Sequence, residues 1–305
     1  MYLLYNSVIR NKNNTNTIEG VGAIYQRIIS LIALSKQTGI PFIHNKINIG
    51  HNDNNIDDNL YDELWDNFFN IKKIELTEEE KQEYTPVYID ILTPYQLQFL
   101  INNKNKKYLI YIKIPYIITY NNPNDYYSLI QNDIIQSYDE VNSNRYLIYN
   151  TDPFKNKINI AIHIRVYNDM DPCGDNIDYL NNYIKCESTR FNLNCDFYIE
   201  LIKKLKYKYQ NSAIHIFSQE KYFDIRFKEL RSIDNINLHL NMDNFETLHH
   251  LCKADVLVLG LSSFSHLAGY YNKNEVIYTH YEYHQKAFDK WIDVDEIMNI
   301  KILKE

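Results

Sequence analysis

Two residues that could hold an anion stand at the end of the most strand-like stretch of the chain. Residues 158–166 alternate branched apolar side chains with small or polar ones, and His163 and Arg165 lie at the end of this run. The pattern predicts a buried strand. In open α/β sheets, ligands bind beyond the carboxyl ends of the strands, where a guanidinium can donate two parallel hydrogen bonds to a phosphate. The alternative for this pair is a surface ion pair at a strand end.

A second polar cluster follows an apolar strand nearer to the carboxyl terminus. The stretch DVLVLGL, residues 255–261, is followed by Ser262, Ser263 and Ser265 at the predicted start of a helix. One of these serines is expected to cap the helix. Hydroxyl groups, backbone amides and the positive end of the helix dipole can also converge on one anion. The serines therefore predict a phosphate site, with helix capping as the alternative.

A glycine-containing helix start lies in the amino-terminal part of the chain. Gly20 and Gly22 precede a helical pattern that carries Arg27 and stops at Gly39. Glycines at such a place let the backbone approach a ligand closely, with the positive end of the helix facing it. Many helix starts use glycine for structural reasons alone, so this pair also has a purely structural interpretation.

The elements that position these residues are most regular after residue 158. The spacing predicts five strands, each followed by a helix except the last; the strands are residues 158–165, 213–218, 236–240, 255–261 and 275–279. Strands that alternate with helices predict a parallel, doubly wound sheet. Ser218 ends the second of these strands. Three strands thus bring polar groups to the same edge of one sheet, which favours a functional interpretation.

The first half is less regular but follows the same α/β pattern. It predicts strands at 2–5, 40–47 and 107–114 and helices at 23–37, 60–69, 94–103 and 126–137. A polar stretch from Asn144 to Lys157 containing Pro153 is the best boundary. We therefore predict two domains, 1–150 and 151–305, with residues 281–305 forming one or two further helices.

Composition excludes several classes of partner. The net charge of -7 provides no basic field for nucleic acid or an anionic membrane. No apolar run reaches 18 residues and the amino terminus does not resemble a signal peptide, so we expect no membrane span and a cytoplasmic location. The cysteines contain no C-x-x-C pair, which disfavours structural zinc. The four cysteines, Cys173, Cys186, Cys195 and Cys252, are expected to be free thiols, although the first three could approach one another.

Read in chain order, the polar stretches resemble the motifs of the GT-B fucosyltransferase-like glycosyltransferases. The stretches are HIR at 163–165, FSQE at 217–220 and SSFS at 262–265, and the glycine loop with Arg27 resembles the amino-terminal loop of that family. The resemblance covers residues 19–40 and 158–280. It implies two Rossmann-like domains facing a cleft, the second of which binds a nucleotide sugar. It also implies transfer without a metal.

The resemblance further assigns roles to individual residues. Arg165 would hold the pyrophosphate of the donor, and His163 would contact the nucleotide. GDP-fucose is the leading donor, and a glycan or protein hydroxyl is the acceptor. Glu19 and Asp169 are candidate general bases, with a solvated surface carboxylate as the alternative for each. The complete donor-binding set is His163, Arg165, Ser218, Ser262, Ser263, Ser265, Gly20, Gly22 and Arg27.

The chain departs from the family motif directly after Arg165. Val166 and Tyr167 stand where the family has arginine and glycine, and Asn168 stands where an acid is expected, with Asp169 one place later. These departures motivate a second hypothesis, a non-catalytic relative that binds a nucleotide or a glycan. A third is a structural or interaction protein that keeps the fold alone.

Overall fold

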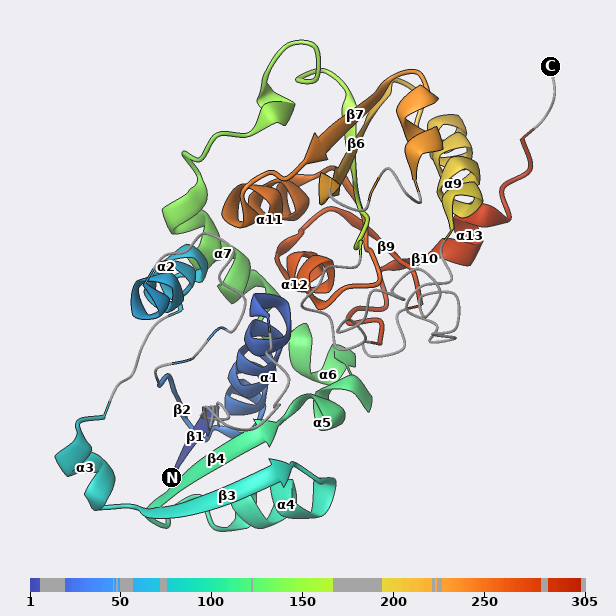
Figure 1. The fold of residues 1–305 in the computed structure, drawn as a ribbon. Coiled ribbons are helices and arrows are strands. Elements are labelled where there is room, and N and C mark those ends of the chain that lie inside the picture. Colours follow the sequence, from blue (N-terminus) through green and yellow to red (C-terminus); the bar gives the residue numbers. More distant parts are fainter. Residues whose placement is uncertain are drawn as a thin grey trace, which may run out of the picture. The chain divides into compact units, whose positions relative to one another are not determined.

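The chain forms two compact α/β units, each built on a parallel sheet. The computed structural model describes residues 1–5, 20–45, 47, 49, 57–71, 76–121, 123–166, 194–220, 223, 227–280 and 285–302. Unit 1 comprises Met1–Asn144 and Ala287–Asp289, and unit 2 comprises Arg145–Lys286 and Lys290–Glu305. All strand pairs in both sheets are parallel (Figure 1). The predicted fold class, two Rossmann-like α/β units with parallel sheets, is confirmed.

The sheet of unit 2 has the strand order β10-β9-β8-β5-β6-β7. Starting from the central strand β5, the chain adds β6 and β7 on one side. It then returns to the centre of the sheet and adds β8, β9 and β10 on the other side. This is the order of the doubly wound dinucleotide-binding fold. The strands are β5 (Ile158–His163), β6 (Ser212–Ser218), β7 (Ile236–Leu240), β8 (Val256–Val258), β9 (Glu275–Tyr278) and β10 (Ile292–Asp293).

Helices cover both faces of this sheet. One face carries a core of branched side chains from β5, β6 and β8 packed against α9 (Cys195–Lys208) and α13 (Val294–Met298). The other face carries α11 (Asn244–Lys253) and α12 (Ser263–Tyr271), which pack against each other (Figure 1). Short 3-10 helices are η1 (Ile148–Asn150) and η3 (Lys228–Ser232). Because both faces of the sheet are covered, even the polar residues of β5, Asn159 and His163, are buried.

The sheet of unit 1 has the order β2-β1-β4-β3. Its strands are β1 (Tyr2–Tyr5), β2 (Phe42–Ile43), β3 (Thr85–Ile91) and β4 (Tyr108–Ile114). The long helix α1 (Val21–Thr38) is buried along most of its length. The other helices described in this unit are α2 (Asp58–Phe69), α3 (Glu78–Gln82), α4 (Pro94–Asn102), α5 (Tyr116–Asn121), α6 (Pro123–Tyr127) and α7 (Gln131–Asn142).

Capping residues fix where the helices begin and end. Gly39 ends α1 in the left-handed region, at a φ of 70°, and its amide donates to the carbonyl of Ser35. Thr93 begins α4 with a reciprocal capping box in which Gln96 is the partner. Asn194 begins α9, where its side chain accepts a hydrogen bond from the amide of Phe197.

The observed elements differ from the predicted ones in both units; in unit 2 the predicted strand at 255–261 shortens to Val256–Val258. Strand β3 was not predicted, and the predicted helix at 126–137 is in fact two helices, α6 and α7. The predicted strand at 40–47 shortens to Phe42–Ile43. Residues 281–305 were expected to be helical, but their described part contains strand β10 as well as α13.

Strand β3 lies at the edge of its sheet and is mostly exposed. Its Tyr88 is 68% exposed and stacks on Tyr111 of β4, with ring centroids 4.9 Å apart. Its second residue is Pro86.

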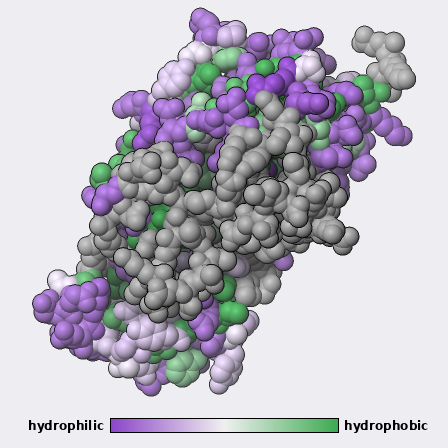
Figure 2. Space-filling view, viewed as in Figure 1, coloured by the Kyte–Doolittle hydropathy of each residue, from purple (hydrophilic) through white to green (hydrophobic). Residues whose placement is uncertain are grey.

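On the face seen in Figure 2, hydrophobic residues are interspersed with hydrophilic ones. No helix among the described residues is both long enough and apolar enough to cross a bilayer.

Candidate functional site

The carboxyl ends of β5 and β8 form the topological switch point of unit 2. The two strands are hydrogen-bonded neighbours, with Ile162 opposite Val258. The next helix described after β5 is α9, which packs on one face of the sheet, whereas α12, which follows β8, packs on the other (Figure 1). Ligands of doubly wound sheets bind at this place. His163 ends β5, and Gly260 follows β8 by two residues.

His163 is held neutral inside the switch point. It is 8% exposed, and its pKa is lowered to about 3, first by burial and then by the positive charge of Arg165. Its Nδ1 atom is buried and has no hydrogen-bond partner among the described residues. A buried polar atom without a partner is costly unless a ligand or water satisfies it.

Gly260 lets the end of β8 approach His163 closely. A Cβ atom at this position would lie 2.3 Å from the carbonyl oxygen of His163 and 2.9 Å from its Nδ1. Neither approach is possible for a residue with a side chain. The imidazole is thus fixed against the turn that leads into α12, and the ring of Phe264 lies 5.7 Å from it.

The three serines at the start of α12 have different environments. The Oγ of Ser262 accepts a hydrogen bond from the amide of Phe264 and caps α12. Ser265 is fully buried, and its Oγ accepts from the amide of Gly260 at 3.0 Å. Ser263 is half-buried in the first turn. The positive end of α12 therefore lies at the switch point, where it favours an anion.

Arg165 lies two residues beyond β5 at the same edge of the sheet and is partly exposed. Ser218 ends the neighbouring strand β6, and its Oγ donates to the carbonyl of Ile164 at 2.8 Å. This bond fixes the backbone directly before Arg165. Val166, the residue after Arg165, is 1% exposed and belongs to the hydrophobic core. The segment after β5 therefore presents one guanidinium group, that of Arg165, and its next residue is part of the core.

The glycine-loop residues lie in unit 1. Gly20 begins α1, and Gly22 is buried in its first turn. Arg27 is 7% exposed, donates from Nη1 to the Oη of Tyr5 at 2.8 Å, and lies about 6 Å from the ring of Tyr116. The switch point of unit 2 brings together the other predicted donor-binding residues. Both candidate bases, Glu19 and Asp169, lie outside the described residues, as do Cys173 and Cys186.

The structure also shows polar groups that the sequence did not reveal. His44 follows β2, is 3% exposed, and its Nε2 lies 2.8 Å from Asp66 Oδ2. Tyr25 donates to the other oxygen of the same carboxylate at 2.7 Å. The three residues are 19 to 41 positions apart, so no local motif could have indicated them. Cys195 and Cys252 are free thiols, as expected.

Comparison with known proteins gives distant matches in structure only. No protein-family model matches the chain. No curated protein matches its sequence. Two crystal structures of POFUT1 in complex with GDP align with it. The first has a TM-score of 0.41 and 9% identity over 91% of this chain and 98% of that one. The second has a TM-score of 0.40 and 10% identity over 96% of each. Similarity at this level carries no functional argument, so the chemistry of the switch point must supply one.

Proposed function

We propose that this protein is a glycosyltransferase that uses a nucleotide-sugar donor, with GDP-fucose as the leading candidate. The observation that carries the proposal is that the carboxyl end of β5, which leads to Arg165, and the amino terminus of α12 meet at the switch point of a doubly wound sheet. Arg165 follows on the same strand end. An anion flanked by a guanidinium and a helix amino terminus is the expected ligand, and the diphosphate of a nucleotide sugar fits that description. The ordered motifs described above favour a GDP-sugar.

The chemistry follows from where charge develops during the reaction. Glycosyl transfer with inversion builds positive charge on the sugar and negative charge on the departing diphosphate. Arg165 and the amides at the start of α12 would stabilise that negative charge, which removes the need for a metal at this place. The neutral His163 would hydrogen-bond the donor without adding charge. The acceptor hydroxyl, on a glycan or a protein, would transfer its proton to Glu19 or Asp169.

A calorimetric panel tests the donor. GDP, UDP, CDP and ADP are titrated into the wild type, into Arg165→Ala and into Arg145→Ala, which removes an exposed arginine outside the switch point. We expect selective GDP binding that Arg165→Ala weakens about tenfold to a hundredfold, because bonds to charged groups contribute roughly 1.5–3 kcal/mol each. Arg145→Ala should bind as the wild type does.

The other outcomes each have a definite meaning. Preference for another diphosphate would keep the reaction class and change the donor. Equal binding by the wild type and Arg165→Ala would refute the site. GDP binding without transfer or hydrolysis of GDP-fucose would favour the non-catalytic relative, for which the replacement of the second arginine by the buried Val166 is the supporting observation.

A further inference from the structure

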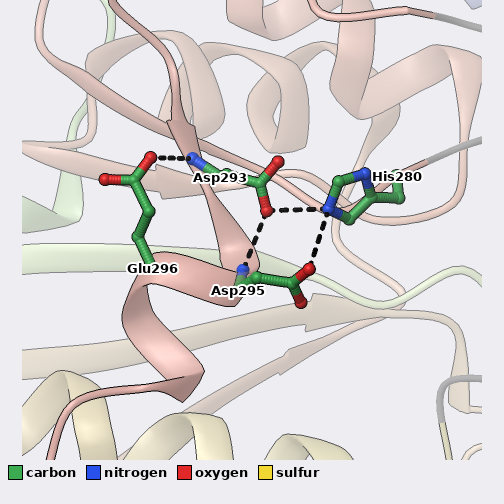
Figure 3. Close-up of polar contacts among 4 residues, drawn as sticks. All are labelled: His280, Asp293, Asp295 and Glu296. Carbon is green, nitrogen blue, oxygen red and sulfur yellow. Dashed lines mark hydrogen bonds and ion pairs between the residues drawn. The ribbon is translucent and has the colours of Figure 1, made fainter.

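Three potential metal ligands of two chemical kinds meet beyond the ends of β9 and β10. They are His280, Asp293 and Asp295, and one ligand atom of each lies within 4.8 Å of the other two. Figure 3 shows the Nε2 of His280 directed at both carboxylates. None of the three belongs to the nucleotide site proposed above, which lies at β5 and β8.

The sheet register brings these side chains together. Strands β9 and β10 are parallel, with Tyr278 opposite Asp293. His280 follows β9 by two residues, and Asp295 lies in the first turn of α13. The three ligands thus come from two strand ends and a helix start that the sheet already holds in place. Such an arrangement costs little further entropy when an ion binds.

The distances match those required around a small divalent ion. The Nε2 of His280 lies 2.7 Å from Asp293 Oδ1 and 3.6 Å from Asp295 Oδ2. Ligand atoms bonded at about 2.1 Å to one ion and roughly at right angles or tetrahedral angles are about 3.0–3.4 Å apart. The observed separations bracket this range. The 2.7 Å separation is a hydrogen bond, and the 3.6 Å separation exceeds a hydrogen bond but lies within the range of an ion pair.

Charge, support and access also suit a cation. Two carboxylates balance the charge of a divalent ion. Asp293 is oriented by the amide of Asp295, which donates to its Oδ1 at 2.9 Å, and by the capping box with Glu296. His280 is 52% and Asp295 74% exposed at the side chain, so an ion can enter and keep water as its remaining ligands.

From these observations we propose that His280, Asp293 and Asp295 bind one divalent transition-metal ion, Mn²⁺ or Zn²⁺. The imidazole ligand favours these ions over Mg²⁺ and Ca²⁺, which prefer oxygen alone. The ion joins β10 and α13 to the end of β9 and thereby fastens the carboxyl-terminal segment to its sheet.

Metal titration of the chelator-treated full chain tests the site. Mn²⁺ is added and the free ion is followed by its electron paramagnetic resonance signal, and Zn²⁺, Mg²⁺ and Ca²⁺ are compared by the shift in melting temperature. We expect one Mn²⁺ per chain, a higher melting temperature with Zn²⁺ or Mn²⁺, and little effect of Mg²⁺ or Ca²⁺.

Variants decide whether these residues are the ligands. The side chains of His280 and Asp295 are both more than half exposed, so His280→Asn and Asp295→Asn should leave the circular dichroism spectrum unchanged. Each should weaken Mn²⁺ binding tenfold or more. Asp90→Asn removes an exposed carboxylate of β3 in unit 1 and should bind as the wild type does. The proposal is wrong if the wild type binds no Mn²⁺ or Zn²⁺ below millimolar concentration, or if His280→Asn and Asp295→Asn bind as tightly as Asp90→Asn.

Discussion

Gly260 is the residue on which the geometry of the switch point depends most directly. Any side chain there would overlap the backbone oxygen of His163, since even a Cβ would lie 2.3 Å away. This oxygen belongs to the end of a central strand and cannot move without disturbing the sheet. Close approach of backbone to backbone is thus the reason for a glycine at this position.

We therefore expect Gly260→Ala to lower the free energy of unfolding by about 1–3 kcal/mol, as overpacking of a well-packed core does, and to weaken diphosphate binding. Urea unfolding and calorimetry measure the two effects. Gly39→Ala is the matched control, because nothing lies within 4 Å of a Cβ there, although its φ of 70° makes it mildly unfavourable. A smaller stability loss for Gly260→Ala than for Gly39→Ala would contradict the steric argument.

The residues of the site differ in how far sequence could predict them. His163 and Arg165 are recognisable because they end a strongly patterned strand. The division of labour among the serines is not, because it depends on the turn that each hydroxyl meets. The importance of Gly260 depends on its approach to a residue 97 positions earlier in the chain, which only the fold reveals.

Among the elements, α12 has an amino terminus with two roles, one structural and one proposed to be functional. Ser262 caps it, and an aspartate would cap it equally well while placing a negative charge where the diphosphate is proposed to bind. We expect Ser262→Ala to cost about 1 kcal/mol of stability. Ser262→Asp should keep the wild-type melting temperature but weaken GDP binding at least tenfold. Equal GDP affinity for Ser262→Asp and the wild type would place the anion elsewhere.

The elements of unit 2 were predictable because they are buried and clearly capped. Strands β5 and β6 carry isoleucines at alternate positions, and Asn194, Asp243 and Ser262 each precede a helix that they cap. Strand β3 was missed because it is an exposed edge strand without such a run. The short β10 depends on pairing with β9 rather than on its own two residues.

At the scale of the whole molecule, buried histidines make stability depend on pH. His163, His215 and His266 are at most 8% exposed, and burial lowers the pKa of each to about 3. His215 lies 3.0 Å from His239, whose pKa is lowered to about 4. In the unfolded chain a histidine titrates near 6.5. Between pH 6.5 and pH 3 the unfolded chain therefore binds more protons than the folded one, and acid destabilises the fold.

We expect the free energy of unfolding to be greatest above pH 6.5 and to fall steeply below it. Each of the fully buried histidines contributes up to about 1.4 kcal/mol per pH unit in this range. Urea unfolding at pH 7.5, 6.0 and 5.0 measures the slope. The variant His215→Gln should lose stability at pH 7.5 but lose less on acidification than the wild type does. Constant stability from pH 7.5 to pH 5.0 would show that these imidazoles are protonated in the fold.

The exposed edge strand β3 has a consequence for how the protein behaves in concentrated solution. A free strand edge offers unpaired amides and carbonyls to which another chain can add. Thr85 donates its amide to the carbonyl of Lys107, the residue directly before β4. Amides alternate in direction along a strand, so the amide position of Pro86 faces outward. Proline has no hydrogen to donate there. The row of outward donors is thus broken near its start, which hinders self-association into extended intermolecular sheets despite the aromatic surface beside it.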